Sequence, residues 1–246
     1  MRESDRRRIV RHLGAVALAG SLALGLAIIS PPDLSKAAAP DMPSLSISGR
    51  AHVIDGDTLV IDGTRVRLEG IDAPESAQRC QTPTGNGWNC GSAAAQALRG
   101  MTAHKEVRCE GSEHDTYGRL IAICRVGALE LNKELVRRGL AWAFVRYSQR
   151  LTSAEAEARR LKIGIWQGES QPAWDYRADR WSQAQAQASA PEGCVIKGNI
   201  SRNGRIYHMP WSPYYDSVQI NPSRGERWFC SEAEALAAGW RPAYTN

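Results

Sequence analysis

One short segment constrains the fold of this chain more than any other feature. Two runs rich in β-branched and apolar residues flank Asp62-Gly63 within residues 58–68. An Asp-Gly pair between two such runs is a strong signal for a two-residue hairpin turn, because both turn positions must accept a positive φ angle. Such a turn fixes the register of the two strands, and it pairs Thr58 with Arg67. The sequence therefore predicts an antiparallel hairpin that brings an arginine beside the start of the first strand.

Four carboxylates gather around this hairpin. Asp55 and Asp57 form an acidic turn just before it, and Asp72 and Glu75 form a second acidic turn shortly after it. With the predicted register, Arg67 lies beside the first acidic turn and only five residues before Asp72. Two carboxylates together with carbonyl and water oxygens make a site for a hard cation such as Ca²⁺ or Mg²⁺. The segment therefore predicts an acidic, metal-binding corner with an arginine at its edge.

The rest of the first 180 residues alternates between strand-like and helix-like patterns. Strands are expected near residues 47–61, 106–110 and 119–126, and helices at 92–101, 132–138 and 153–161. Ser92 is expected near the first helix's N-cap, and Thr152 or Ser153 at the third's. Short strands in a hairpin-rich first half, followed by helices, favour an α+β fold around a small barrel.

The first 39 residues have the layout of an export signal. Basic residues precede an apolar run at 13–29, and small residues follow at 37–39. The run is long for a signal peptide and short for a spanning helix, which leaves cleavage or retention as an inner-membrane anchor open. We therefore expect an exported protein that is secreted, periplasmic or anchored by residues 13–29. The segment holds six basic and three acidic residues, so most of the net charge of +5 belongs to it and says little about nucleic acid.

The six cysteines agree with export, because an even number in an exported chain favours disulfides. Local pairing is the simplest arrangement, and it predicts the bonds Cys80–Cys90, Cys109–Cys124 and Cys194–Cys230. Free buried thiols are the alternative for each pair. A zinc site built from Cys194, Cys230 and His208 is a further alternative, although it lacks an obvious fourth ligand.

A low-complexity stretch divides the chain near its end. Residues 181–191 are rich in Gln and Ala and are predicted to be a linker, which separates a domain at 40–180 from a small disulfide-stapled, β-rich module at 192–246. Within the module, Ser231 to Glu234 has the pattern of a helix-capping box. The module serves either as a substrate or envelope tether or as an added source of stability.

Three motifs in order carry a family resemblance over roughly residues 46–180. They are Asp55-Gly-Asp57-Thr58, Arg67-Leu-Glu-Gly-Ile-Asp72-Ala-Pro-Glu75 and Asp115-Thr-Tyr-Gly-Arg119. In type and spacing the chain resembles the thermonuclease (staphylococcal nuclease-like) family. The resemblance implies a five-stranded oligonucleotide-binding (OB) barrel with about three helices. It also implies bound Ca²⁺ and a monomer that hydrolyses DNA and RNA to 3′-phosphorylated products.

The resemblance also implies a role for each motif residue. Asp57 and Asp72 match the calcium carboxylates, Ala73 matches a main-chain carbonyl ligand, and Asp55 matches a residue that supports the metal turn. Glu75 matches the group that activates the attacking water.

Three further residues match the family's contacts with substrate. Arg67 and Arg119 match the phosphate-binding arginines that stabilise the transition state, and Tyr117 matches a tyrosine that helps to hold a substrate phosphate. Arginine suits phosphate binding because it donates planar pairs of N–H groups to phosphate oxygens. Tyr147 is not part of this match; it is expected to pack in or line the cleft, and we name it as a second candidate for binding substrate.

Two other functions compete with a nuclease. One alternative is an OB-fold protein of the cell envelope that binds nucleic acid without cutting it. The other is an envelope protein whose function resides mainly in the C-terminal module. Association with a membrane is expected only if the N-terminal segment stays uncleaved. A pure binding protein has no use for Glu75 beside two arginines, so the residues favour the enzyme.

Overall fold

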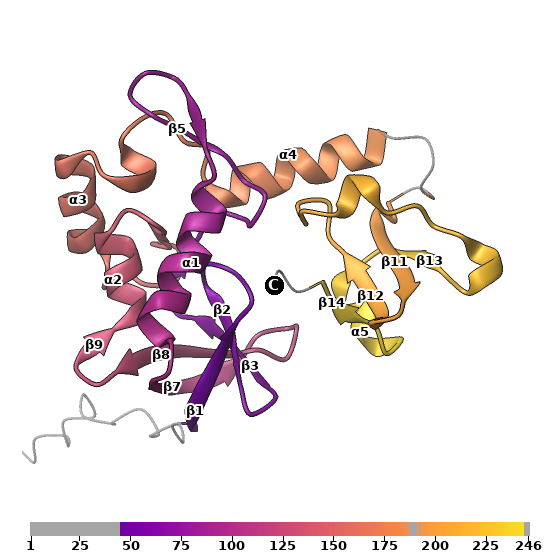
Figure 1. The fold of residues 1–246 in the computed structure, drawn as a ribbon, viewed down its shortest axis with the longest axis horizontal. Helices are drawn as coiled ribbons and strands as arrows, with labels where there is room; N and C mark the ends of the chain where they lie inside the picture. The colour runs from indigo at the N-terminus through magenta and orange to yellow at the C-terminus, as the bar shows by residue number, and fades with distance from the viewer. Residues whose placement is uncertain (1–44, 187–190, 192, 244–246) are drawn as a thin grey trace, which may run out of the picture. The chain divides into compact units, whose positions relative to one another are not determined.

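The computed structural model describes residues 45–186, 191 and 193–243. Five of its strands form a closed barrel (Figure 1). The barrel strands are β1 (Leu45–Val53), β2 (Thr58–Ile61), β3 (Thr64–Leu68), β7 (Glu106–His114) and β8 (Leu120–Val126). They follow the order β3-β2-β1-β7-β8, and the parallel pairing of β3 with β8 closes the ring. The predicted α+β fold around an OB barrel is confirmed.

The predicted hairpin has the predicted register. Strands β2 and β3 are antiparallel, and Thr58 lies opposite Arg67. Asp62 and Gly63 have φ angles of 46° and 81°, which is the left-handed conformation that a tight two-residue turn requires at both positions. The turn chemistry of two residues thus places Arg67 at the acidic corner.

One short strand extends the barrel sheet, and two further pairs form separate two-stranded sheets. β9 (Leu129–Glu130) adds to the edge of β8, β4 (Ile71–Asp72) pairs with β10 (Trp142–Ala143), and β5 (Cys80–Gln81) pairs with β6 (Gly87–Trp88).

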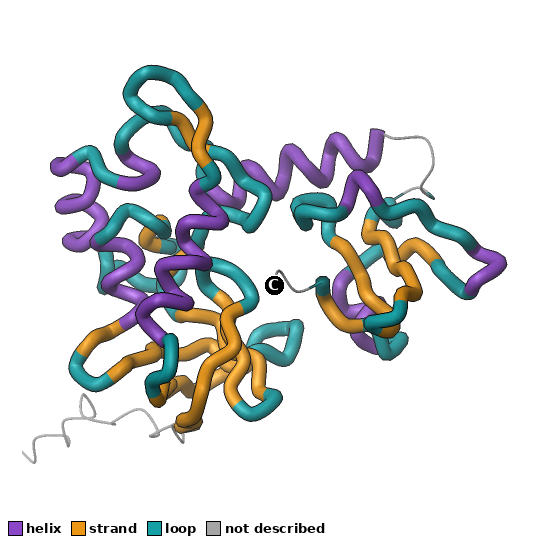
Figure 2. The backbone as a smooth tube through the Cα atoms, viewed as in Figure 1, coloured by secondary structure: helices purple, strands orange, loops and turns teal. Residues whose placement is uncertain are grey.

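Four α-helices accompany the barrel within residues 45–186 (Figure 2). They are α1 (Cys90–Thr102), α2 (Leu131–Arg137), α3 (Thr152–Leu161) and α4 (Ala173–Ala186), with a 3₁₀ turn at Gly164–Trp166. The first three match the predicted helices to within two residues at each end. Their predicted caps are wrong, because the N-cap positions are Asn89 in α1 and Leu151 in α3, and neither side chain caps its helix. Thr152 lies inside α3, where its hydroxyl donates to the Gln149 carbonyl instead.

Two hydrophobic cores hold this part of the chain together. The larger core joins the barrel to the first three helices, through buried residues such as Leu59, Leu98 and Leu135. A smaller core contains the Cys80–Cys90 pair, Trp142, Ile165 and Ala173. Because Ala173 is the first residue of α4, the second core fixes the start of that helix.

Helix α4 reaches into the stretch that was predicted to be a linker. The helix ends at Ala186, so residues 182–186 are helical. Alanine, glutamine and arginine are good helix formers, and this sequence therefore has no local reason to leave the helix. Trp181 and Ala184 also pack in hydrophobic clusters with residues of the C-terminal part.

The C-terminal part is β-rich, as expected. Its strands are β11 (Ile196–Ser201), β12 (Gly204–His208), β13 (Arg227–Phe229) and β14 (Arg241–Pro242), in the sheet order β13-β11-β12-β14. It also contains α5 (Glu232–Ala237) and 3₁₀ turns at Tyr215–Ser217 and Pro222–Arg224. Ser231 caps α5 by accepting a hydrogen bond from the Glu234 N–H, whereas the Glu234 carboxylate bonds to the Cys230 N–H.

All six cysteines are paired in the three predicted disulfides. Cys109 and Cys124 lie directly opposite each other on β7 and β8. The zinc alternative is wrong, because Cys194 and Cys230 are bonded to each other and His208 Nε2 is within 3.0 Å of Asn199 Oδ1.

The predicted export signal at residues 1–39 lies outside the described residues. Among the residues that are described, no helix is long and apolar enough to cross a membrane.

Candidate active site

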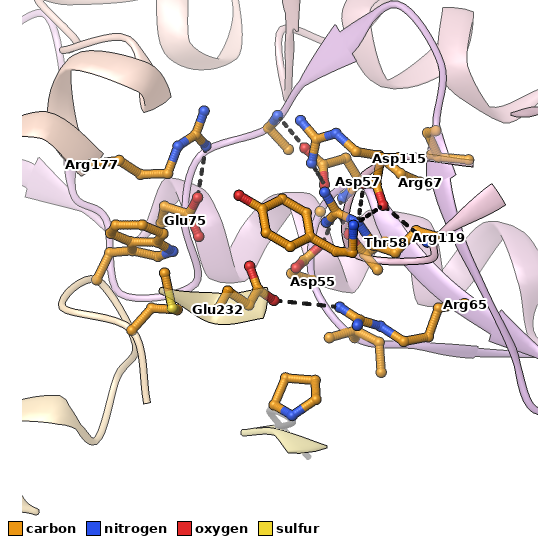
Figure 3. A pocket seen from close by; sticks show the side chains of 18 of the residues that line it. Asp55, Asp57, Thr58, Arg65, Arg67, Glu75, Asp115, Arg119, Arg177 and Glu232 are labelled. Atoms are coloured by element: carbon orange, nitrogen blue, oxygen red, sulfur yellow. Dashed lines mark hydrogen bonds and ion pairs between the residues drawn. The ribbon is translucent and has the colours of Figure 1, made fainter. Parts of the chain in front are cut away.

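Asp57 is the centre of the acidic corner. Its side chain is buried, and Oδ1 accepts hydrogen bonds from the Thr58 hydroxyl at 3.1 Å and from Arg67 Nη1 at 2.8 Å. Its other oxygen, Oδ2, accepts from the backbone N–H of Ala73 at 2.9 Å. One carboxylate therefore ties the hairpin to the second acidic turn. Figure 3 shows Asp57 and Thr58 beside Arg67.

Asp72 completes a bridge between the two acidic turns. It is fully buried at the end of β4, where it pairs with Trp142 of β10. Its Oδ1 accepts a hydrogen bond from Arg67 Nη2 at 3.0 Å. The single guanidinium of Arg67 thus spans Asp57 and Asp72, so the structure brings together three of the predicted site residues.

Close packing fixes the shape of the first acidic turn. Asp55 Oδ1 accepts a hydrogen bond from the Asp57 N–H at 3.0 Å. A Cβ added at Gly56 would lie 2.6 Å from Ala73 Cβ and 2.8 Å from Ala94 Cβ, both of which are short, rigid neighbours. Glycine at position 56 is therefore what lets this turn lie against the second acidic turn and α1.

The backbone of Glu75 is held by contacts that the sequence did not reveal. Its N–H donates to Gln78 Oε1 at 3.1 Å, and Gln78 Nε2 donates to the Gln171 carbonyl at 2.7 Å. A Cβ added at Gly91 of α1 would lie 1.7 Å from the Glu75 carbonyl oxygen, so helix and turn are in direct contact. The signal for Gln78 was its place three residues after Glu75, a spacing at which a side chain can bond back to the backbone.

Arg177 of α4 is the largest omission from the predicted site. Its Nη2 lies 2.7 Å from Asp72 Oδ2, and its Nη1 lies 3.1 Å from Asp72 Oδ1 and 2.8 Å from Glu75 Oε1. Figure 3 shows it reaching Glu75. No motif could have found it, because it stands more than 100 residues from both partners and beyond the three motifs.

Arg119 and Tyr117 lie in a loop organised by Asp115. The Asp115 Oδ1 atom accepts the backbone N–H groups of Tyr117 and Arg119, each at 2.9 Å, while Oδ2 accepts from Arg119 Nε at 2.7 Å. The Arg119 guanidinium lies 5.4 Å from the centre of the Tyr117 ring. Both residues line the same cavity as Asp57 and Glu75. Among the described residues Asp115 is the one carboxylate that pairs with Arg119, whose terminal nitrogens do not take part in that bond.

Tyr147 lies on the rim of the same cavity. Its side chain is 75% exposed, and its ring lies 5.1 Å from that of Phe144, which in turn lies 5.9 Å from Trp174 of α4. Trp142 is buried and packs edge-on against Trp174. An exposed ring such as that of Tyr147 is available to a ligand, whereas Trp142 is a packing residue.

Burial separates the proton affinities of the acidic residues. Burial raises the pKa of Glu75 to about 8, helped by Asp55 and Asp57 and opposed by Arg177. Burial and the nearby Asp57 raise the pKa of Asp55 to about 6. Burial also disfavours the charged form of Asp57, but Arg67 and the Ala73 N–H outweigh it and lower the pKa of Asp57. Asp57 is therefore a stable anion, whereas Glu75 can take up or release a proton near neutral pH.

The donor set fits a hard cation better than a transition metal. Asp57 and Asp72 offer buried carboxylate oxygens that already gather around one cationic group, the guanidinium of Arg67. Oxygen ligands of this kind suit Ca²⁺ or Mg²⁺. Within the described part of the chain, no three His, Cys, Asp or Glu side chains form a ready-made metal cluster. A cation at this corner would thus depend on two carboxylates, carbonyls and waters.

Comparisons with known proteins place the chain. A family model described as "Staphylococcal nuclease homologue" matches residues 65–168, and a model described as "ArfC" matches residues 176–242. The first match contains Arg67, Asp72, Glu75 and Arg119, whereas Asp57 precedes it.

For three curated relatives, the region aligned with this chain covers most of the relative's own length. The chain is 36% identical over 137 residues to "Succinoglycan biosynthesis protein ExoI" of Rhizobium meliloti, and the aligned region covers 54% of this chain and 72% of that protein. It is 33% identical over 145 residues to a micrococcal nuclease of Shigella flexneri, and the aligned region covers 51% of this chain and 77% of that protein. It is 33% identical over 126 residues to a thermonuclease of Staphylococcus hyicus, and the aligned region covers 47% of this chain and 72% of that protein. With this barrel and this set of relatives, the chain belongs to the staphylococcal nuclease family.

Proposed function

We propose that this chain is an exported, Ca²⁺-dependent nuclease that hydrolyses phosphodiester bonds of DNA and RNA with low sequence specificity. The observation that supports it most is the bridge by Arg67 between Asp57 and Asp72, in the cavity that Glu75 and Arg119 also line. This arrangement combines an anionic corner for a cation, a candidate base and two arginines for phosphate.

The metal would be held by the carboxylates of Asp57 and Asp72 and the main-chain carbonyl of Ala73, with Asp55 supporting the turn. A bound Ca²⁺ supplies positive charge that neutralises a phosphate oxygen. The oxygen-only donor set is consistent with this choice.

Glu75 is the proposed general base. In-line attack by water needs a group that accepts a proton, and a base is most effective when its pKa lies near the working pH. The raised pKa of Glu75 satisfies that condition. Arg67 and Arg119 donate N–H groups to the phosphate oxygens as negative charge grows on them.

The proposed products and substrates are those that the family resemblance implies. Departure of the 5′-oxygen leaves a 3′-phosphorylated product. Because water is the nucleophile, the reaction needs no 2′-hydroxyl, which is consistent with cleavage of both DNA and RNA. Tyr117 and Tyr147 line the cavity, which supports a role for them in contacting substrate, and the protein is proposed to act as a monomer.

Location and domain organisation remain proposals. Three disulfides favour an oxidising compartment, which is consistent with a secreted or periplasmic protein. Association with a membrane is expected only if the N-terminal segment is retained. The division into residues 1–39, 40–180, 181–191 and 192–246 stays a prediction.

A digestion assay tests the function. Purified residues 40–246 are incubated with plasmid DNA and with RNA, in Ca²⁺ or in a calcium chelator. Digestion of both substrates in Ca²⁺, and none in chelator, is expected. Glu75→Gln should lower the rate by roughly 10²–10⁴, whereas Glu106→Gln on the exposed end of β7 should not.

Two results would reject the proposal or part of it. Full activity in Glu75→Gln would remove that residue's role as base. Binding of nucleic acid without turnover in Ca²⁺ would favour the non-catalytic OB-fold protein of the envelope.

A further inference from the structure

We propose that Arg177 of α4 is a positioning residue that holds the catalytic carboxylates in the metal-free protein and competes with Ca²⁺ for Asp72. The inference rests on the proposed Ca²⁺ site and adds to it a residue beyond the nuclease-family match, which ends at residue 168.

The guanidinium of Arg177 binds the carboxylate oxygens of Asp72 that a cation at this corner would also need. It makes two hydrogen bonds to Asp72, one to each carboxylate oxygen, and a third to Glu75. Asp72 Oδ1 also accepts from Arg67, so both oxygens of this buried carboxylate already face guanidinium groups. A divalent cation at Asp72 would lie against two positive charges. At least one arginine must therefore withdraw before the cation binds with full strength.

Arg177 is better placed to withdraw than Arg67. Arg67 stands in β3, which is paired on both sides within the barrel, and its two terminal nitrogens are divided between Asp57 and Asp72. Arg177 extends from a helix, and its side chain is 24% exposed against 21% for Arg67, so the two differ in their backbone setting and not in exposure. A change of side-chain rotamers is enough to carry its guanidinium into water.

The backbone of α4 need not move for this to happen. Ala173 is buried in the smaller core, and Trp174 contacts both Trp142 and Phe144. Gln171, just before the helix, accepts the hydrogen bond from Gln78. Because the helix start is anchored, Arg177 stays close to the site and re-forms its bonds when the cation leaves.

The proposal predicts opposite effects of one substitution. In the metal-free protein, Arg177 pairs with the buried Asp72 carboxylate, so its removal leaves Asp72 with less compensation. In the Arg177→Gln variant, no guanidinium at position 177 competes with Ca²⁺ for the Asp72 carboxylate. Arg177→Gln should therefore lower the melting temperature in chelator and also tighten Ca²⁺ binding. A merely structural arginine would not tighten it.

Calorimetric titration with Ca²⁺ alone tests this on residues 40–246. Arg177→Gln should bind Ca²⁺ about tenfold more tightly than the parent protein, the scale of losing one charge-assisted contact. Arg180→Gln is the matched control, because Arg180 lies one turn later on α4 and bonds to Asp216 and the Pro210 carbonyl. Its Ca²⁺ affinity should stay within about twofold of the parent, well below the tenfold step.

Each outcome decides a separate point. Equal or weaker binding in Arg177→Gln overturns the competition while leaving the metal site intact. No Ca²⁺ binding in any of the proteins overturns both the metal site and the competition. If Arg177→Gln does not fold, Arg177→Lys takes its place, because it keeps the charge but loses the paired contact to Asp72. About threefold tighter binding is then expected, and unchanged or weaker binding overturns the proposal.

Discussion

Arg67 Nη1 lies 2.8 Å from Asp57 Oδ1, and this contact joins β3 to the acidic turn that precedes β2. The second terminal nitrogen of Arg67 reaches Asp72. The geometry depends on the planar fork of the guanidinium, because a single ammonium group cannot hold both carboxylates in this way.

Arg67→Lys should therefore lower nuclease activity by about 10²–10³, since the charge remains but the paired donors are lost. The rate of DNA digestion in saturating Ca²⁺ measures this effect. Arg108→Lys, on an exposed side chain of β7, is the control and should retain the parent rate. A rate for Arg67→Lys within twofold of the parent would contradict this role.

Gly56→Ala should destabilise the protein by about 1–3 kcal/mol, because the added methyl group collides with the side chains of Ala73 and Ala94. Urea unfolding in chelator measures the change. Gly100→Ala is the matched control, since nothing lies within 4 Å of a Cβ added there and the residue is within α1. Alanine should stabilise that helix by up to about 1 kcal/mol. A neutral Gly56→Ala would show that the acidic turn can shift freely.

The stability of the metal-free protein should fall as the pH rises from about 6.5 to 8. Burial raises the pKa of Glu75 from 4.5 to about 8, so in this window the unfolded chain has lost a proton that the folded chain still holds. This stabilisation is complete below pH 4.5 and is lost as the pH rises through 8. Melting temperatures in chelator should therefore drop with pH in the parent protein and stay flatter in Glu75→Gln.

Of the groups with shifted pKa values that titrate below this window, Asp55 and His208 lie nearest to it, and they do not affect the comparison between pH 6.5 and 8. The pKa of Asp55 is raised to about 6, mainly by burial. Burial, followed by Lys197, lowers the pKa of His208 to about 4, which makes stability rise with pH below about 6.5. Both groups are shared by the parent and Glu75→Gln. Parallel curves for the two proteins above pH 6.5 would contradict a raised pKa at Glu75.

Replacing Cys109 and Cys124 together by alanine should destabilise the protein by about 3 kcal/mol, because their bond closes a loop of 15 residues in the unfolded chain. Both residues are buried in the larger core. Urea unfolding without reductant measures the loss. Adding reductant should lower the stability of the parent protein more than that of the double variant, and equal losses would show that this bond contributes nothing.

Local chemistry explains what the sequence determined. The turn at Asp62-Gly63 sets the register of its own hairpin, so the position of Arg67 beside the first acidic turn follows from ten neighbouring residues. The pairing of Cys109 with Cys124 follows in the same way from two strands joined by a short connection. The hairpin, the predicted acidic corner and three helices thus came from patterns that act over short stretches of chain. The OB barrel came from the family resemblance, because its closing pair of strands, β3 and β8, lies far apart in sequence.

The residues that reach the acidic corner from distant parts of the chain are set by tertiary packing. Arg177 reaches Asp72 across 105 positions of sequence because the start of α4 packs in the smaller core, around Ala173 and Trp142. Gln78 joins the Glu75 turn to Gln171 for the same reason. No local propensity encodes such contacts, since they arise from burying apolar surface between distant segments. Local sequence patterns were therefore enough to predict the acidic corner, whereas the packing of a distant helix sets which charges surround it.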